Sequence, residues 1–178
     1  MNPAGIGPVF QYAYFVEDIA SAAAGWAATV GAGPFFVAAH HRADRFTYRG
    51  TDVEADVSYA FGYSGGAQIQ LIEQHDELPS IYRDLYPTGV FGFHHVAMLV
   101  EDYAGERQRL LDAGFELACE LWANDIVACY FDTRPAIGAM TELHIRTDRI
   151  VETFDRWHRA HLAWDGIGEP LSTHVSGT

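Results

Sequence analysis

The sequence has few cysteines, and their surroundings exclude the usual cysteine-based sites. Cys119 and Cys129 are the only two, and neither a CxxC pair nor a Cys/His zinc spacing is present. Both lie in apolar, strand-like stretches, so we expect two buried, reduced thiols rather than a disulfide or a soft-metal site. This cysteine usage predicts a cytoplasmic protein.

Positive charge and long apolar runs are also scarce. The 11 Lys and Arg residues are outnumbered by 24 Asp and Glu residues, which gives a formal net charge of −13. A surface this acidic repels nucleic acid and anionic lipid, so neither is expected as a partner. No segment reaches the roughly 18 continuous apolar residues that a membrane span requires. The N-terminus has no basic region followed by an apolar run, so no secretory signal is predicted.

An internal repeat organises the chain. Val16-Glu17-Asp18 recurs 84 residues later as Val100-Glu101-Asp102. In each copy about six strand-like residues precede the acidic pair, and a helical stretch, a glycine and an aromatic residue follow it. Asp18 and Asp102 are suited to cap the two helices. Three further strand candidates follow each helix, at 35–41, 53–63 and 67–73 and then at 115–122, 126–132 and 139–146.

This pattern predicts the α+β class, with two tandem βαβββ modules and a C-terminal helix. Turns are expected at Ser64-Gly65-Gly66 and Asn124-Asp125, a short helix at 78–86, and a last helix at 149–162 anchored by Trp157 and Trp164. We expect a single compact domain with module 1 at 1–75, a helical linker at 76–91, module 2 at 92–147, and a C-terminal helix and tail at 148–178.

Four polar residues stand where such strands should be hydrophobic. These are Gln11, Gln70, His95 and Glu142, and the offset from Gln11 to His95 is again 84 residues. Period-2 alternation places Gln70 and Glu142 on the face opposite the apolar residues that would pack on the helices. Burying such groups without partners costs on the order of a few kcal/mol each. A shared cation or a hydrogen-bonded network is therefore expected on the concave side of the sheet.

Three motifs carry a family resemblance: FHHVAMLVEDY from Phe93, AQIQLIEQ from Ala67 and GAMTELHI from Gly138. They resemble strands of the vicinal oxygen chelate superfamily (the glyoxalase/bleomycin-resistance/dioxygenase proteins), in the glyoxalase-like subgroup related to methylmalonyl-CoA epimerase. The resemblance implies a half-open, barrel-like mixed sheet, a homodimer, a small-molecule substrate and one divalent ion (Mg, Mn, Co, Ni or Zn). It assigns the ion to Gln11, Gln70, His95 and Glu142.

Gln11 departs from the family pattern, because the epimerases typically have His at this position. A neutral amide oxygen is a weaker ligand than imidazole and suits harder ions.

The resemblance also implies a reaction type. A divalent ion that chelates two adjacent substrate oxygens stabilises the enolate formed when a base removes the proton α to a carbonyl. An isomerase, epimerase or lyase is therefore expected. The candidate catalytic residues are Glu142, Glu54 and His144, with Asp56 as an alternative to Glu54. Candidate residues of an apolar substrate pocket are Tyr12, Tyr14, Tyr59, Phe61 and Tyr63.

Simpler interpretations remain open. His95 alone reads as a core histidine, and Glu142 alone as an ion-pair partner of Arg134 or Arg146. A metal-free binding protein for apolar or aromatic small molecules is one alternative. An Fe-dependent ring-cleaving dioxygenase is another; it usually needs two His and one carboxylate, so His144 would have to join. His94 is the alternative ligand to His95, but the repeat register places it on the opposite face. Five further histidines receive no role and are expected on loops or helix surfaces: His40, His41, His75, His158 and His161.

Overall fold

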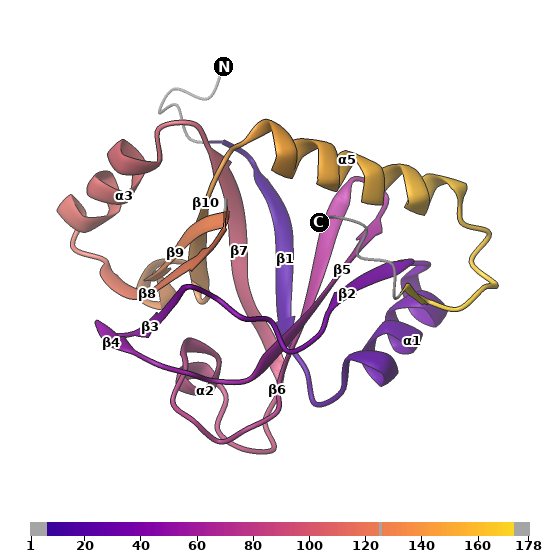
Figure 1. Cartoon of the computed structure of the whole chain (residues 1–178), viewed down its shortest axis with the longest axis horizontal. Helices are drawn as coiled ribbons and strands as arrows, with labels where there is room; N and C mark the ends of the chain where they lie inside the picture. The colour runs from indigo at the N-terminus through magenta and orange to yellow at the C-terminus, as the bar shows by residue number, and fades with distance from the viewer. Residues whose placement is uncertain (1–6, 125, 173–178) are drawn as a thin grey trace.

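The computed structural model describes residues 7–124 and 126–172, whose strands form one open mixed sheet (Figure 1). The strands are β1 (Val9–Phe15), β2 (Phe35–Ala38), β3 (Arg45–Tyr48), β4 (Thr51–Asp52), β5 (Val57–Ser64), β6 (Ala67–Gln74), β7 (Gly92–Val100), β8 (Glu116–Ala123), β9 (Ile126–Asp132), β10 (Met140–Ile145) and β11 (Leu171–Ser172). The helices are α1 (Ile19–Val30), α2 (Ile81–Leu85), α3 (Tyr103–Asp112), α4 (Arg134–Ile137) and α5 (Asp148–Ala163). The sheet order is β11-β2-β5-β6-β1-β7-β10-β9-β8-β3-β4.

Two equivalent halves meet at the centre of this sheet, where β1 and β7 pair in antiparallel fashion. One half has the order β2-β5-β6-β1 and the other the mirrored order β7-β10-β9-β8. The pairs Gln11↔Ala97 and Ala13↔His95 are exchanged by the same 84-residue offset that relates the sequence repeat. The expected α+β class, with two tandem modules, an open mixed sheet and a C-terminal helix, is confirmed.

The last strand of each module lies parallel to its first strand. In the first half Ala13 pairs with Gln70, and in the second half the equivalent Ala97 pairs with Glu142. Gln70 and Glu142 therefore occupy matching positions. The sheet topology alone brings the two modules' polar residues to the same level, on either side of the central strand pair.

Helices α1 and α3 cover one face of the sheet. Ile69 and Leu71 of β6 pack with Ile19 of α1, and Leu143 of β10 packs with Leu110 of α3, as period-2 alternation predicts. The predicted caps are also confirmed. A carboxylate oxygen of Asp18 accepts a hydrogen bond from the Ser21 amide at 2.6 Å, and Asp102 caps α3 in the same way.

The other face carries the larger core, with α2 and α5 against it. Helix α5 runs along the open side of the sheet from β10 toward α1 (Figure 1). Trp157 of α5 stacks on Phe61 of β5, with ring centroids 5.2 Å apart, and on Phe36 of β2 at 5.5 Å. Trp164 follows α5 and packs so closely on Gly33 that a Cβ there would lie 2.9 Å from its ring. Both tryptophans therefore anchor the helix, as predicted.

Several predicted boundaries are wrong. The strand predicted at 53–63 begins only at Val57, and the short hairpin of β3 and β4, which precedes this segment, was not predicted. This hairpin pairs with β8 of the second module, through Arg45↔Trp122 and Phe46↔Leu121. Local alternation cannot reveal a partner so distant in sequence. The linker helix is shorter than predicted, α4 was not predicted, and Asp125 of the predicted turn lies outside the described residues.

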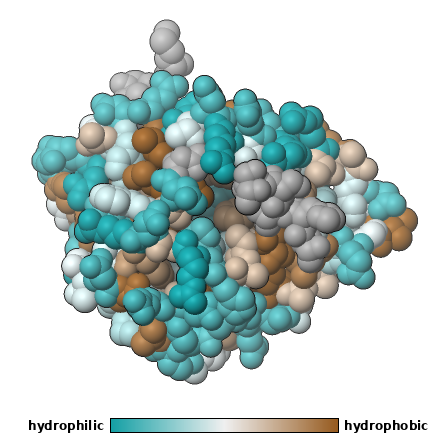
Figure 2. Space-filling model, viewed as in Figure 1, coloured by the Kyte–Doolittle hydropathy of each residue, from teal (hydrophilic) through white to brown (hydrophobic). Residues whose placement is uncertain are grey.

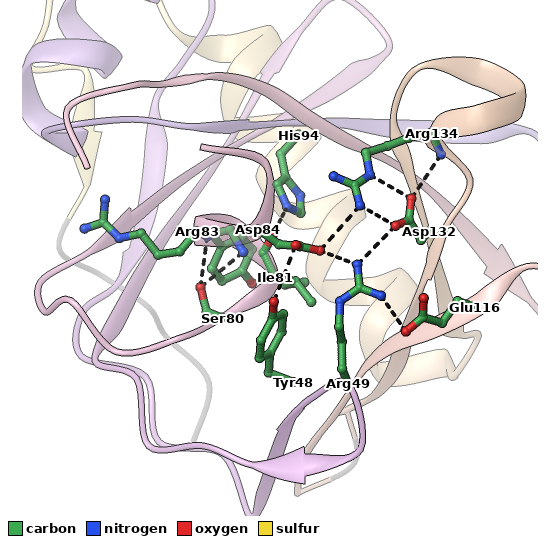
Figure 3. A network of polar contacts seen from close by, with 11 residues as sticks. Tyr48, Arg49, Ser80, Ile81, Arg83, Asp84, His94, Glu116, Asp132 and Arg134 are labelled. Carbon is green, nitrogen blue, oxygen red and sulfur yellow. Dashed lines mark hydrogen bonds and ion pairs between the residues drawn. The ribbon is translucent and has the colours of Figure 1, made fainter. Parts of the chain in front are cut away.

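A partly buried ion network ties this hairpin to the second module (Figure 3). The Arg49 guanidinium lies 2.6 Å from Asp84 of α2, 3.2 Å from Asp132 of β9 and 2.5 Å from Glu116 of β8. Asp132 also pairs with Arg134 at the start of α4. The hydrogen bond from Arg134 outweighs the opposing effect of burial and lowers the pKa of Asp132 to about 2. One guanidinium thus connects four segments of the chain.

Figure 2 shows mostly hydrophilic residues on the face viewed, with hydrophobic residues in small separate groups. Among the described residues, no helix is long and apolar enough to cross a membrane.

Candidate functional site

Gln11, Gln70, His95 and Glu142 meet on the face of the sheet that α5 partly covers. The Gln11 amide nitrogen lies 2.8 Å from the Gln70 amide oxygen, 3.4 Å from a Glu142 carboxylate oxygen and 3.5 Å from His95 Nε2. His95 Nε2 is 3.0 Å from that carboxylate oxygen. All four side chains are buried. The structure therefore brings together the whole set that the sequence singled out.

A β-bulge sets the orientation of His95. The register of β1 against β7 passes from Ala13↔His95 to Tyr14↔Phe93, so His94 is an extra residue in β7. The prediction that His94 lies on the opposite face is wrong for this reason. Its Nδ1 lies 2.8 Å from Nδ1 of His95. Its Nε2 lies 3.1 Å from the Ile81 carbonyl oxygen (Figure 3).

These contacts fix the proton positions on both rings. Burial and the neighbouring His95 lower the pKa of His94 to about 3, so His94 is neutral near pH 7. Because the Ile81 carbonyl can only accept, His94 carries its proton on Nε2, and its bare Nδ1 accepts the Nδ1–H of His95. His95 Nε2 is thereby directed at Glu142. Outer contacts of this kind orient the histidines that bind metals in proteins.

Glu142 supplies the negative charge of the cluster. Burial alone would raise the pKa of its carboxyl, but the hydrogen bond and the electrostatic interaction with His95, with smaller contributions that include the Tyr130 hydroxyl, hold the pKa below its ordinary value. The ring of Tyr130 also stands edge-on to His95, with centroids 5.1 Å apart. The carboxylate oxygen and the imidazole nitrogen therefore face each other closely enough, at 3.0 Å, to bind one cation together.

The donor set fits a hard or borderline divalent ion. His95 offers an imidazole nitrogen, Glu142 a carboxylate, and Gln70 an amide oxygen. In this structure Gln11 turns its NH₂ group toward the other three side chains, where two hydrogens face three acceptors. Rotating the Gln11 amide by half a turn would present its oxygen instead and complete a set of four ligands.

A cavity of about 290 Å³ opens beside this cluster, and its walls are mostly apolar. Gln11, Gln70 and Glu142 form part of the wall, so a molecule in the cavity reaches the cluster directly. Strands β5, β8 and β9 contribute apolar residues, and α5 closes the remaining side with Ile150, Phe154 and Trp157. The arrangement suits a small molecule with an apolar body and a polar end.

The predicted pocket residues divide into two groups. Tyr59 and Phe61 line the cavity as predicted. Tyr12 and Tyr14 do not, because they alternate with Gln11 and lie on the opposite face of β1; Tyr14 packs on Trp26 of α1 with ring centroids 4.9 Å apart. Tyr63 also does not line the cavity, since it lies farther along β5 against His158 of α5, with ring centroids 4.8 Å apart.

The predicted catalytic residues are likewise separated. Glu142 and His144 line the cavity. Nδ1 of His144 lies 2.9 Å from the carbonyl oxygen of Ile145, so this nitrogen carries a proton and Nε2 is the basic atom of the neutral ring. Glu54 and Asp56 line a neighbouring hollow of about 180 Å³ rather than the cavity itself. His41 and Tyr59 belong to the walls of both spaces, which therefore adjoin each other.

Sequence reasoning missed four features of the site: His94, His41, Tyr130 and the contribution of α5. The apolar residues Ile150, Phe154 and Trp157 recur at helical spacing, which is the signal that predicts a face packed on the sheet. Tyr130 shares a strand face with Ala128 and Ile126, so alternation was informative there as well. No pattern in the sequence signals the bulge at His94.

Comparisons with known proteins agree with this architecture. The sequence profile of the Glyoxalase/Bleomycin resistance protein/Dioxygenase superfamily matches residues 10–130. No curated protein sequence matches the chain significantly.

Solved structures show the same fold. Methylmalonyl-CoA epimerase from Mycobacterium tuberculosis aligns with a TM-score of 0.62 at 17% identity, covering 85% of this chain and 96% of that one. A hypothetical protein from Bacillus halodurans C-125 aligns with a TM-score of 0.57 at 17% identity, covering 80% and 96%. A methylmalonyl-CoA epimerase in complex with methylmalonyl-CoA and NH₄⁺ aligns with a TM-score of 0.54 at 17% identity, also covering 80% and 96%.

Proposed function

Because the chain belongs to the Glyoxalase/Bleomycin resistance protein/Dioxygenase superfamily, we propose that it is a divalent-metal-dependent isomerase, epimerase or lyase acting on a carbonyl compound through an enolate. The observation that carries the proposal is the convergence of Gln11, Gln70, His95 and Glu142 in the wall of an apolar cavity. Burying a carboxylate and an imidazole beside two amides costs free energy, which a bound ion or ligand would offset.

In this proposal the same four side chains hold the ion, with Gln11 turning its amide oxygen inward. A bound divalent ion would supply Lewis-acid stabilisation of the negative charge that develops on the substrate oxygens. His94 keeps His95 in the tautomer that leaves Nε2 available, and α5 limits the access of water to the cluster.

His144 is the base that the geometry favours. It lies two residues beyond Glu142 on β10, lines the same cavity, and has its Nδ1–H tied to the Ile145 carbonyl. Nε2 of the neutral ring can accept the proton α to a substrate carbonyl. Glu142 is the other candidate within the cavity. Glu54 would require the substrate to extend into the neighbouring hollow.

The shape of the cavity suggests a substrate class. A volume of about 290 Å³ accommodates a compact acyl or aryl group next to its chelating oxygens. Tyr59, Phe61 and Trp157 provide aromatic walls that favour an apolar or aromatic group over a short polar chain.

Metal content and proton exchange together test the proposal. Chelator-free wild-type protein is analysed for bound metal beside His95→Ala and Glu142→Ala. Gln68→Ala is the matched control, because Gln68 is a buried amide on the same strand as Gln70 but outside the cluster. We expect both cluster variants to lose the metal and the control to keep it.

The reaction is tested with the same proteins in deuterated water. Metal-loaded wild-type protein should catalyse the incorporation of deuterium at the carbon α to the carbonyl of methylmalonyl-CoA or of an aryl-substituted dicarbonyl compound. His144→Ala should keep the metal and lose the exchange. Unchanged metal content in both cluster variants would reject the metal site.

One observation favours a second candidate, a metal-free binding protein for apolar or aromatic small molecules. The Gln11 NH₂ group donates hydrogen bonds to Gln70 at 2.8 Å and to Glu142 at 3.4 Å, and so satisfies part of the cluster without an ion. Tight binding of an aromatic ligand by metal-free protein, unaffected by added divalent ions, would support this candidate. The dioxygenase alternative is less favoured, because it needs His144 as a third ligand and, among the described residues, no hydrogen bond joins His144 to His95 or Glu142.

A further inference from the structure

A second group of metal-binding side chains lies outside the cavity, at one end of the first module. His40 follows β2, Asp56 precedes β5, and His75 follows β6. Because β2 and β6 are both antiparallel to β5, the end of each lies beside the start of β5. Backbone hydrogen bonds of 2.8 Å from His41 to Val57 and from His75 to Asp56 hold the three segments together at this end.

The donor atoms are close enough to share one ion. One ligand atom from each of His40, Asp56 and His75 lies within 4.8 Å of the other two. Nδ1 of His40 is 2.8 Å and 3.0 Å from the two carboxylate oxygens of Asp56. The two imidazole rings lie with their centroids 4.5 Å apart. Two imidazoles that both became protonated at this distance would repel each other, whereas two neutral rings can share a cation.

The contacts of His75 place its ring proton on Nδ1 and leave Nε2 as the atom that can bind an ion. Its Nδ1 lies 3.1 Å from a Glu73 carboxylate oxygen, which holds the ring proton on that side. Its Nε2 lies 2.7 Å from the Ser58 hydroxyl, which itself accepts a hydrogen bond from the His40 backbone amide at 2.9 Å. The hydroxyl proton therefore occupies the lone pair of Nε2, where an ion can replace it. A carboxylate on the outer nitrogen is the usual support of a metal-binding histidine.

The local charge also favours a dication. Besides Asp56 and Glu73, Asp76 lies at this end and accepts a hydrogen bond from the Asp56 amide at 2.7 Å. We propose that His40, Asp56 and His75 form a surface site for a transition-metal dication of the Zn²⁺ class, separate from the central cluster. Two imidazole nitrogens and one carboxylate, with water completing the shell, are a typical set for this ion.

The site is tested with Zn²⁺ alone, by equilibrium dialysis of chelator-stripped protein. We compare wild type, the surface variant His40→Ala/His75→Ala, the central variant His95→Ala/Glu142→Ala, and the variant with all four changes. Asp56→Asn provides a second test of the surface site with little change in shape. His158→Ala, which removes an imidazole outside both groups, is the control.

We expect the surface variant to bind one equivalent of Zn²⁺ fewer than the wild type, and the central variant to keep that equivalent. Asp56→Asn should weaken the same equivalent at least tenfold, and His158→Ala should match the wild type. Equal Zn²⁺ binding by wild type and surface variant would overturn the proposal. Complete loss of Zn²⁺ in the central variant alone would overturn it too. If the central cluster binds no Zn²⁺, only the equivalent of Zn²⁺ expected at that cluster is missing. The surface site is therefore tested independently of the proposed function.

Discussion

The Nδ1 atoms of His94 and His95 lie 2.8 Å apart on consecutive residues of β7, in a contact that regular strand geometry would not permit. The bulge places both rings in the same buried network. The Ile81 carbonyl keeps the His94 proton on Nε2, so Nδ1 of His94 accepts the Nδ1–H of His95. One histidine thus sets the tautomer of the other.

This relationship predicts a positioning role for His94. In His94→Phe the acceptor for the His95 Nδ1–H is lost, so the affinity for Co²⁺ or Ni²⁺ should fall by about 10- to 100-fold. His94→Gln offers a carbonyl acceptor and should recover part of the loss. Isothermal titration of both variants checks this, and equal affinities for His94→Phe and wild type would contradict it.

Gln11 is expected to limit metal affinity. An imidazole is a stronger ligand than a neutral amide for borderline ions, so Gln11→His should bind Co²⁺ or Ni²⁺ about tenfold more tightly, ~1.4 kcal/mol. Gln11→Leu should bind more weakly than the wild type, because it removes one ligand. A competition titration with a chromogenic chelator measures both. The idea fails if Gln11→His binds no more tightly than Gln11→Leu.

The two faces of the sheet give a matched pair of aromatic substitutions. Phe61 lines the cavity and stacks on Trp157, whereas Tyr12 lies on the opposite face. Phe61→Leu should weaken the binding of an aromatic probe such as anilinonaphthalene sulfonate by about tenfold. Tyr12→Leu should leave it unchanged. Fluorescence titration distinguishes them, and similar losses in both variants would argue against binding in this cavity.

The Arg49 network predicts a pH-dependent contribution to stability. The pKa of Asp132 is lowered to about 2, so its stabilising effect is fully present above the ordinary carboxyl pKa and is lost as the pH falls through about 2. Arg49→Met should lower the free energy of unfolding by about 2 kcal/mol at pH 7, because it leaves partly buried carboxylates with less compensation.

Urea unfolding at several pH values provides the measurement. The difference between wild type and Arg49→Met should shrink toward pH 2, where Asp132 becomes protonated. Arg159→Met is the control, because Arg159 is exposed on α5 and should change stability by less than about 0.5 kcal/mol. A difference that stays constant with pH would show that packing, and not charge, accounts for the effect.

Much of the fold could be predicted from local patterns. Asp18 and Asp102 mark the helix starts because a cap needs only its own next few residues. Ile69 and Leu143 mark the helix-facing side because alternation is a property of a single strand. The predicted family resemblance is confirmed over residues 10–130. The third-strand boundary failed because the hairpin of β3 and β4 is determined by its pairing with the distant β8.

Some residues of the candidate site could likewise be predicted from local patterns, and others depend on tertiary packing. Gln11, Gln70, His95 and Glu142 were identified as polar residues in apolar strands, and the 84-residue offset relates Gln11 to His95. The strand faces and the family resemblance predicted that all four would meet. The prediction that Tyr12 and Tyr14 line the cavity is wrong, because alternation along β1 places them on the face opposite Gln11. His41 and Phe154 could not be assigned to the cavity, since their positions depend on how β2 and α5 pack on the sheet.

By itself, the sequence determined the repeated strand and helix pattern, the caps, and the polar residues that the strands carry toward one face, because each depends on the periodicity of the backbone over a few residues. Only the tertiary structure decided which polar groups touch, which tautomer His95 adopts, and which walls enclose the cavity. Those depend on a bulge of one residue and on contacts between segments more than 40 residues apart, such as His95 with Glu142, to which no local periodicity is sensitive.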